Sequence, residues 1–141
     1  MDIFNEIEQE KISHAISLAE NQTSGEIRVC VERHCEEPAL DRAKKYFEKL
    51  GMDNTALKNG VLLYVAAEDK KFAIIGDQGI NLKVPENFWE DTKTLMQGFF
   101  KQGLLVEGLQ AGIASAGDQL KVFFPRAEDD INELPNDVVQ F

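Results

Sequence analysis

The pattern of apolar and polar positions is organised around residues 59–80. Residues 61–65 form a continuous apolar run, which favours a strand buried on both faces. A polar turn at residues 68–70 separates this run from a second one at residues 72–75, so we expect an antiparallel hairpin. The glycines of Gly76-Asp77-Gln78-Gly79 favour a turn after it, because glycine tolerates positive φ.

Helix-like and strand-like periodicity alternate before this hairpin. Apolar residues at three- and four-residue spacing predict an amphipathic helix over residues 2–21, with Asp2 as its cap. Apolar residues at every second position predict a strand over residues 26–32. A second helix is expected over residues 38–50, where a proline stands at the start and a glycine follows the end. Strand, helix and strand in this order predict a parallel pair joined by a right-handed crossover.

Two more helices are expected after the hairpin, over residues 85–101 and 105–123. A short fourth strand is expected over residues 81–84. The fold class is therefore predicted as α/β, a three-layer α/β/α sandwich with a central mixed sheet of three to four strands. We expect helices on both faces of the sheet, two on each.

The length of 141 residues suits one domain, which we place at residues 1–125. Residues 126–141 form an acidic C-terminal tail, with one arginine against several carboxylates. This composition predicts a flexible or loosely docked segment whose removal leaves the fold intact. The alternative is that its apolar residues dock in a groove; these are Val138, Val139 and Phe141.

The charge of the chain limits its partners. A formal net charge of −10, without a cluster of Lys or Arg, argues against a nucleic-acid partner. The sequence has no apolar stretch near the roughly 20 residues of a membrane span. Its first residues lack a basic segment followed by an apolar one, so we expect no secretory leader. We expect a cytoplasmic monomer in which Cys30 and Cys35 are reduced thiols.

Oxygen-bearing side chains gather where the strands should meet at one end of the sheet. Chain direction places Glu26, Asp53, Asn59 and Asp77 at this end, with Asn54 or backbone carbonyls beside them. Hard cations take several such oxygens, so we predict a Ca²⁺ or Mg²⁺ site there. The alternative is that these residues only form caps and turns. The opposite end should collect a second polar group, made of His34, Glu36, Glu37, Glu68 and Asp69.

Other chemistry finds little support in the sequence. It has no GxSxG elbow, no HExxH, no P-loop, no GxGxxG and no EF-hand loop. No catalytic residue is predicted from the residues alone.

An ordered set of short motifs resembles the TPM domain family, over roughly residues 5–124. The motifs are Thr23-Ser24-Gly25-Glu26-Ile27-Arg28-Val29, Asn59-Gly60-Val61-Leu62-Leu63-Tyr64-Val65-Ala66, Asp69-Lys70-Lys71 and Gly76-Asp77-Gln78-Gly79-Ile80, followed by Trp89, Phe99, Gly103, Gly108 and Gly112. The resemblance is to the short, stand-alone bacterial type of member. Asp77-Gln78-Gly79 stands where many members have a Gly-aromatic-Gly turn.

The resemblance implies an α/β/α sandwich, acid phosphatase activity as attributed to a plant member, and divalent-cation binding as in some members. The function predicted is a TPM-domain protein with a loop-based divalent-cation site and metal-dependent, phosphatase-like activity. In that reading a cation would polarise a phosphoryl oxygen or activate water. The alternative is a non-enzymatic domain that binds another protein through a sheet-end surface or the acidic tail.

Overall fold

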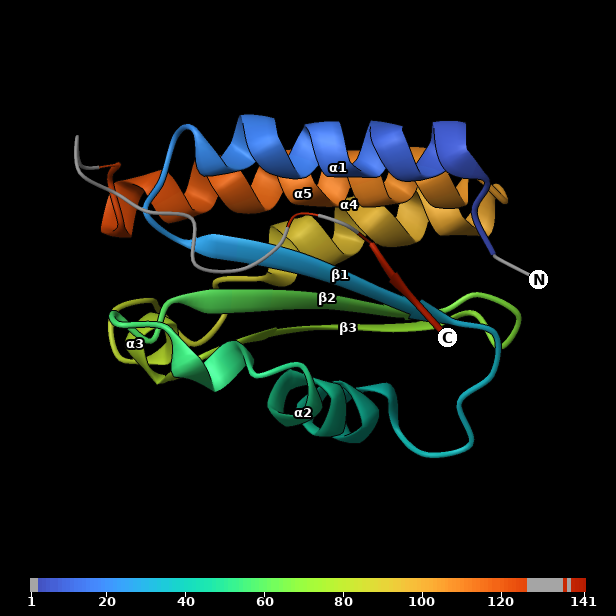
Figure 1. The fold of residues 1–141 in the computed structure, drawn as a ribbon, viewed down its shortest axis with the longest axis horizontal. Coiled ribbons are helices and arrows are strands. Elements are labelled where there is room, and N and C mark those ends of the chain that lie inside the picture. The colour runs from blue at the N-terminus through green and yellow to red at the C-terminus, as the bar shows by residue number, and fades with distance from the viewer. Residues whose placement is uncertain (1–2, 127–135, 137) are drawn as a thin grey trace.

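A mixed sheet of four strands forms the centre of the computed structural model, which describes residues 3–126, 136 and 138–141. The strand order is β3-β2-β1-β4, with bounds β1 (Glu26–Glu32), β2 (Gly60–Ala66), β3 (Lys71–Gly76) and β4 (Val139–Gln140). Helices cover both faces of the sheet (Figure 1). The predicted α/β sandwich with a mixed sheet is confirmed.

The hairpin and its parallel neighbour follow the predicted connectivity. β1 pairs in parallel with β2 from Glu26 opposite Gly60 to Glu32 opposite Ala66, and β2 pairs antiparallel with β3. Every residue of β2 is buried. Its neighbours on both sides and the helices on both faces exclude water from it, as the unbroken apolar run predicts.

The helices are divided unequally between the two faces. Figure 1 shows α1 (Glu6–Glu20), α4 (Glu90–Lys101) and α5 (Leu105–Phe123) on one face and α2 (Ala39–Lys49) on the other. The expectation of two helices per face is wrong: α1 and α5 pack side by side, and α4 packs on α5. Over the residues that the structure describes, no helix has the length and apolarity needed to cross a bilayer.

Two helices begin later than their patterns predict. α1 starts after Asn5, whose side chain accepts a hydrogen bond from the Glu8 N–H while the Glu8 carboxylate accepts one from the Asn5 N–H. This capping box satisfies two otherwise unpaired amides, whereas Asp2 lies outside the described residues. α4 starts at Glu90, because residues 86–89 form a turn after Pro85.

The prediction of a fourth strand over residues 81–84 is wrong. The Asp77 side chain caps the Gln78 amide and starts the short helix α3 (Gln78–Asn81), whose Ile80 is fully buried. The fourth strand is β4, at the end of the chain, paired in parallel with β1 at Cys30 and Val31.

The expectation of a loose tail is wrong for the last four residues. Val138 is buried, β4 lies beside β1, and the Phe141 ring stacks on Tyr46. The alternative in which Val138, Val139 and Phe141 dock is the one that the structure favours. The rest of the acidic segment, residues 127–135 and 137, lies outside the described residues.

Candidate functional site

The backbone brings three of the four predicted cation ligands side by side at the start of β1 and β2. The Glu26 N–H donates to the Asn59 carbonyl at 3.1 Å, and the Asp77 N–H donates to the Gly60 carbonyl at 2.9 Å. Asn59 is buried and its Nδ2 donates to the Ser24 carbonyl at 2.7 Å. These three residues therefore lie at the same end of the sheet, as chain direction predicts.

Asp77 carries an unsatisfied oxygen in this group. Its side chain is 9% exposed, and Oδ1 accepts a hydrogen bond from the Gln78 N–H at 2.7 Å. Its second oxygen, Oδ2, is buried and has no hydrogen-bond partner. A buried carboxylate oxygen without a donor or a cation is costly, so this atom is a chemically available ligand.

The loop before β2 adds neutral oxygens near the same end. Thr55 is buried and its Oγ1 has no hydrogen-bond partner. The backbone of this loop lies directly against α3: a Cβ on Gly79 would overlap the carbonyl oxygens of Leu57 and Lys58, at 2.5 Å from the latter. A glycine at position 79 therefore permits the close approach of this loop to α3, the helix that Asp77 caps.

Asp53 does not join the other predicted ligands by any contact that the structure shows. It is exposed, in the short 3₁₀ helix η1 (Met52–Asn54), and its carbonyl accepts a hydrogen bond from Lys58. Over residues 3–126, 136 and 138–141, no group of three or more His, Cys, Asp or Glu side chains is arranged to hold a metal ion. A cation at this end would rely on Asp77, with Glu26 and neutral oxygens as candidates for the remaining ligands, and not on Asp53.

Glu20, at the last turn of α1, is a second buried carboxylate close to this end. Its Oε2 accepts a hydrogen bond from the Ile27 N–H at 3.0 Å, whereas Oε1 has no hydrogen-bond partner. Burial raises the pKa of Glu20 to about 7, although the Ile27 hydrogen bond opposes the shift and the charge of Glu26 adds to it. This group therefore titrates near neutral pH.

The opposite end of the sheet holds a compact set of polar contacts around His34. His34 Nε2 lies 2.7 Å from Glu68 Oε2, and His34 Nδ1 lies 3.2 Å from Asp69 Oδ1. Asp69 Oδ2 accepts a hydrogen bond from the Cys35 N–H at 2.6 Å. That bond and the one to His34 hold the pKa of Asp69 below its usual range. These contacts join the loop after β1 to the turn between β2 and β3.

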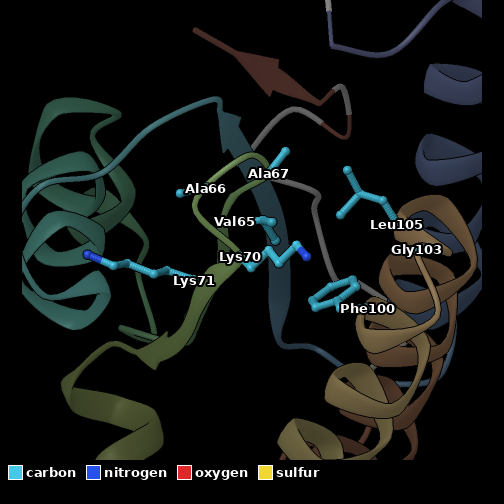
Figure 2. A pocket seen from close by; sticks show the side chains of 8 residues that line it. All are labelled: Val65, Ala66, Ala67, Lys70, Lys71, Phe100, Gly103 and Leu105. Atoms are coloured by element: carbon cyan, nitrogen blue, oxygen red, sulfur yellow. The ribbon is translucent and has the colours of Figure 1, made fainter.

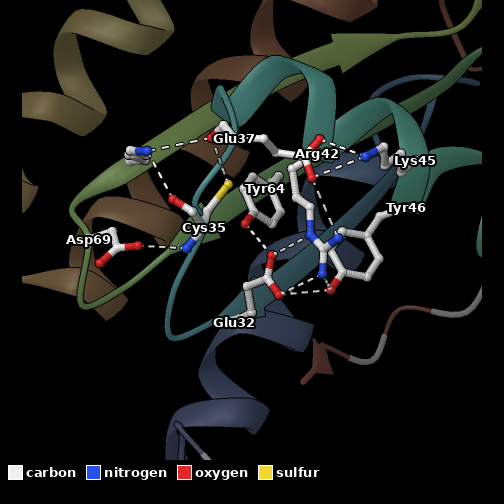
Figure 3. A network of polar contacts seen from close by, with 9 residues as sticks. Glu32, Cys35, Glu37, Arg42, Lys45, Tyr46, Tyr64 and Asp69 are labelled. Atoms are coloured by element: carbon white, nitrogen blue, oxygen red, sulfur yellow. Dashed lines mark hydrogen bonds and ion pairs between the residues drawn. The ribbon is translucent and has the colours of Figure 1, made fainter.

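Glu32, the last residue of β1, is the centre of a buried polar network (Figure 3). Its carboxylate accepts hydrogen bonds from Arg42 Nε at 3.0 Å, from Tyr46 Oη at 2.8 Å and from Tyr64 Oη. Arg42 Nη2 also donates to Tyr46 Oη at 2.9 Å. The network fixes α2, which carries Arg42 and Tyr46, to the sheet.

The protonation states in this network suit a structural role. Burial alone would raise the pKa of Glu32, but hydrogen bonds from Arg42 and the two tyrosines, together with the Arg42 charge, hold it below its usual value. Burial and the Glu32 carboxylate raise the pKa of Tyr46 to about 12, and burial raises the pKa of Cys30 to about 12. A carboxylate that resists protonation and a thiol that resists deprotonation are poor proton-transfer groups and nucleophiles at neutral pH.

Sequence reasoning missed Glu32 and Tyr64 as partners. The register of β1 and β2 places Cys30 opposite Tyr64 and Glu32 two residues further along the same face. A charged residue ending an apolar strand was the available signal, but its partners lie on other elements. Thr55 was missed because a hydroxyl in a polar loop has no distinctive pattern.

An apolar cavity of about 230 Å³ lies between the β2–β3 turn and the junction of α4 with α5 (Figure 2). Val65 lines it from β2 and Ala67 from the β2–β3 turn, whereas Phe100 and Leu105 line it from the helices. Lys70 extends toward Phe100, whereas Lys71 points away toward α2, where its Nζ donates to the Cys35 carbonyl. Apart from the two lysines, the described residues that line this cavity are apolar or glycine, and none is a carboxylate, a histidine or a thiol.

Comparison with known proteins identifies near and distant relatives. The family model described as the TPM domain matches residues 1–119. The NMR structure of BA42 protein from the psychrophilic bacterium Bizionia argentinensis is similar at 48% identity and a TM-score of 0.93. The match covers 99% of this chain and 97% of that one. No curated protein matches the chain.

Two remote structures share the fold. The N-terminal domain of a protein from P. gingivalis has a TM-score of 0.70 at 18% identity, covering 86% of this chain and 79% of that one. The N-terminal domain of cg2496 protein from Corynebacterium glutamicum has a TM-score of 0.66 at 13% identity, covering 84% and 74%. The family match covers most of the chain, and the ordered motifs and the fold agree with it. The chain belongs to the TPM domain family.

Proposed function

We propose that this TPM domain binds a divalent cation, Ca²⁺ or Mg²⁺, at the sheet end that holds Asp77. The observation that carries the proposal is Asp77 Oδ2, a buried carboxylate oxygen with no hydrogen-bond partner. A hard cation would supply the missing electrostatic partner. The chain would supply Asp77, with Asn59, Glu26, Thr55 and the backbone carbonyls of the adjoining loop as the candidates for the remaining ligands.

The composition of this ligand set indicates weak binding. Affinity for Ca²⁺ rises with the number of charged ligands and with the rigidity of the site. Asp77 is the only carboxylate of the set with an oxygen shown to lack a partner, and Asp53 is exposed. We therefore expect a dissociation constant of about 10⁻⁴ to 10⁻³ M.

The decisive experiment is a titration of ¹⁵N-labelled protein with CaCl₂ and, separately, MgCl₂. Amide shifts around Gly60, Asp77 and Gln78 should change and saturate. Asp77→Asn keeps the oxygen that caps Gln78 but removes the charge, so we expect it to weaken binding at least tenfold. Asp118→Asn is the matched control, because Asp118 is exposed and pairs only with Lys121 in the described contacts.

Thermal unfolding supplies an independent measure. A ligand at ten times its dissociation constant stabilises the folded state by about 1.4 kcal/mol. The wild-type protein should therefore melt at higher temperature in about 10 mM Ca²⁺ if that constant is about 1 mM, and the melting temperature of Asp77→Asn should rise much less. Equal responses of wild type and Asp77→Asn would contradict the proposal, and Thr55→Val tests the hydroxyl separately.

Phosphatase activity follows as a second, dependent proposal, which the family resemblance motivates. When bound, a cation would neutralise the charge on a phosphoryl group near this acidic surface. Asp77 would hold the cation and would not itself attack the substrate. Hydrolysis of p-nitrophenyl phosphate by the cation-loaded wild type, and its loss in Asp77→Asn, would support this second proposal. Cation binding without hydrolysis would contradict it and would indicate a non-enzymatic binding domain.

A further inference from the structure

The end of the chain binds the edge of β1 in the manner of a peptide ligand. β4 pairs in parallel with Cys30 and Val31, and the Phe141 N–H donates to the Val31 carbonyl at 2.9 Å. β1 continues to Glu26, so β4 covers only part of this edge over the described residues. We call the surface formed by Cys30, Val31, Phe4 and Tyr46 the β1-edge site.

Side chains of the bound segment alternate between the two faces of the sheet. Val138 is buried in the core on the side of α1, and Gln140 Oε1 on that side accepts a hydrogen bond from the Phe4 N–H at 2.6 Å. Val139 packs into the core on the side of α2. A peptide that binds a sheet edge as an added strand places alternate side chains on opposite faces of the sheet, where each contacts its own partner. Residues 138–141 follow this pattern.

The α2 face of the β1-edge site holds an aromatic ring. Phe141 stacks on Tyr46 with 4.8 Å between ring centroids and 20° between their planes. The Lys49 Nζ lies 5.1 Å from the centroid of the Phe141 ring, within the range of a cation–π contact. Tyr46 is fixed by its hydrogen bond to Glu32, so the aromatic platform exists without its occupant.

We infer that the β1-edge site is a recognition surface for an extended peptide of a partner protein, and that residues 138–141 occupy it in cis. The peptide would carry two β-branched residues, then Gln, then an aromatic residue. A partner segment that continues on its N-terminal side would pair with more of β1 than β4 does. The site lies at the end of β1 opposite to Glu26, so this inference is independent of the cation proposal.

Residues 138–141 and an external peptide would compete for the β1-edge site, because the contact that residues 138–141 make there is small. β4 is two residues long, and Phe141 remains 49% exposed. The contacts of this four-residue segment are a small part of those that hold the fold, so its release costs less than global unfolding. The apparent affinity for an added peptide is reduced by the fraction of molecules in which the segment is bound. Weakening the internal segment should therefore tighten binding of the external one.

The test uses the full chain and a fluorescein-labelled peptide with the sequence of residues 136–141. Full-length Val138→Ala/Phe141→Ala should bind this peptide at least tenfold more tightly than wild type does, by fluorescence anisotropy. The same peptide with alanine in place of its phenylalanine should bind at least fivefold more weakly. In ¹⁵N spectra of the variant, the peptide should shift the amides of Phe4, Cys30 and Val31.

Several outcomes would overturn the inference. These are equal affinity for wild type and variant, equal affinity for the two peptides, or amide shifts confined to other parts of the protein. A dimer of the full-length protein that excludes the peptide would assign the surface to a second copy instead. If the double variant does not melt cooperatively, Gln140→Ala removes only the hydrogen bond to Phe4, and it too should bind the peptide more tightly than wild type.

Discussion

The Phe141 ring lies flat against the Tyr46 ring, on the same side of the sheet as the Glu32 network. Tyr46 also stacks on Tyr64, with 5.8 Å between centroids. The end of the chain therefore extends an aromatic row that runs from β2 to α2. It is part of the packing on this face, which gives the first prediction.

Phe141→Ala should lower the free energy of unfolding by about 1 kcal/mol. A stacked aromatic pair contributes about 0.5–1.5 kcal/mol beyond the effect of its buried area. Because Phe141 is about half exposed, the hydrophobic free energy from burying its ring is small. Chemical denaturation measures the change. Val122→Ala is the control, because Val122 is 71% exposed on α5 and its truncation should cost almost nothing. Equal midpoints for the two variants would mean that the stacking contributes no stability.

Gly79→Ala should destabilise the protein by about 3 kcal/mol. The added methyl group would overlap the Leu57 and Lys58 carbonyls, which are backbone atoms that cannot rotate away. Gly98→Ala is the matched control in α4, where a Cβ meets nothing within 4 Å. Alanine is a better helix former than glycine, so Gly98→Ala should stabilise by about 0.5–1 kcal/mol. Thermal melting of both variants gives the comparison, and a neutral Gly79→Ala would refute the tight loop packing.

Glu20→Gln should remove a pH dependence of stability around neutrality. The folded-state pKa of Glu20 is about 7, above its ordinary value of 4.5, so the folded state binds more protons than the unfolded state between these values. Wild-type stability due to this group is therefore present at low pH and is lost as pH rises toward 7. Relative to wild type, Glu20→Gln should gain stability from pH 5 to pH 8, by an amount on the order of 2–3 kcal/mol. Urea denaturation of wild type and Glu20→Gln at several pH values measures this. A constant difference between their midpoints from pH 5 to pH 8 would contradict the titration of Glu20.

Glu32→Gln should cost about 2 kcal/mol at pH 7. The variant keeps the shape of the side chain but loses the charge that Arg42, Tyr46 and Tyr64 stabilise by donating hydrogen bonds. The pKa of Glu32 is lowered in the folded state, so its contribution is present above the unfolded pKa and is lost as pH falls through the folded one. The gap between wild type and variant should thus narrow below pH 4.5, which denaturation at pH 7 and pH 3 measures. Asp118→Asn should show no comparable cost.

The sequence predicted the elements whose pattern is local and strong. The apolar run of β2 identified a central strand, and the α5 bounds of Leu105–Phe123 agree with the predicted residues 105–123. Strand direction then placed Glu26, Asn59 and Asp77 at one end, because parallel strands share their starting edge. These predictions needed no information on distant contacts.

Other features depend on partners far away along the chain. Composition marked residues 126–141 as a loose tail, whereas burial of Val138 depends on its place beside β1. The loop ligand group also differs from expectation, since Asp53 faces solvent and the unpaired oxygens belong to Thr55 and Asp77. The positions of acidic residues in the sequence do not show which side-chain oxygens become buried in the fold and which stay exposed to solvent.

The position of β4 beside β1 has a consequence for protein synthesis. The ribosome completes β1, which ends at Glu32, long before it reaches Val139, where the strand that covers the outer edge of β1 begins. Until then the Cys30–Val31 edge presents unpaired backbone groups, which is the arrangement that chaperones protect and that neighbouring nascent chains can join. Synthesis of β4, and not the folding of the helices, is therefore the step that closes this edge.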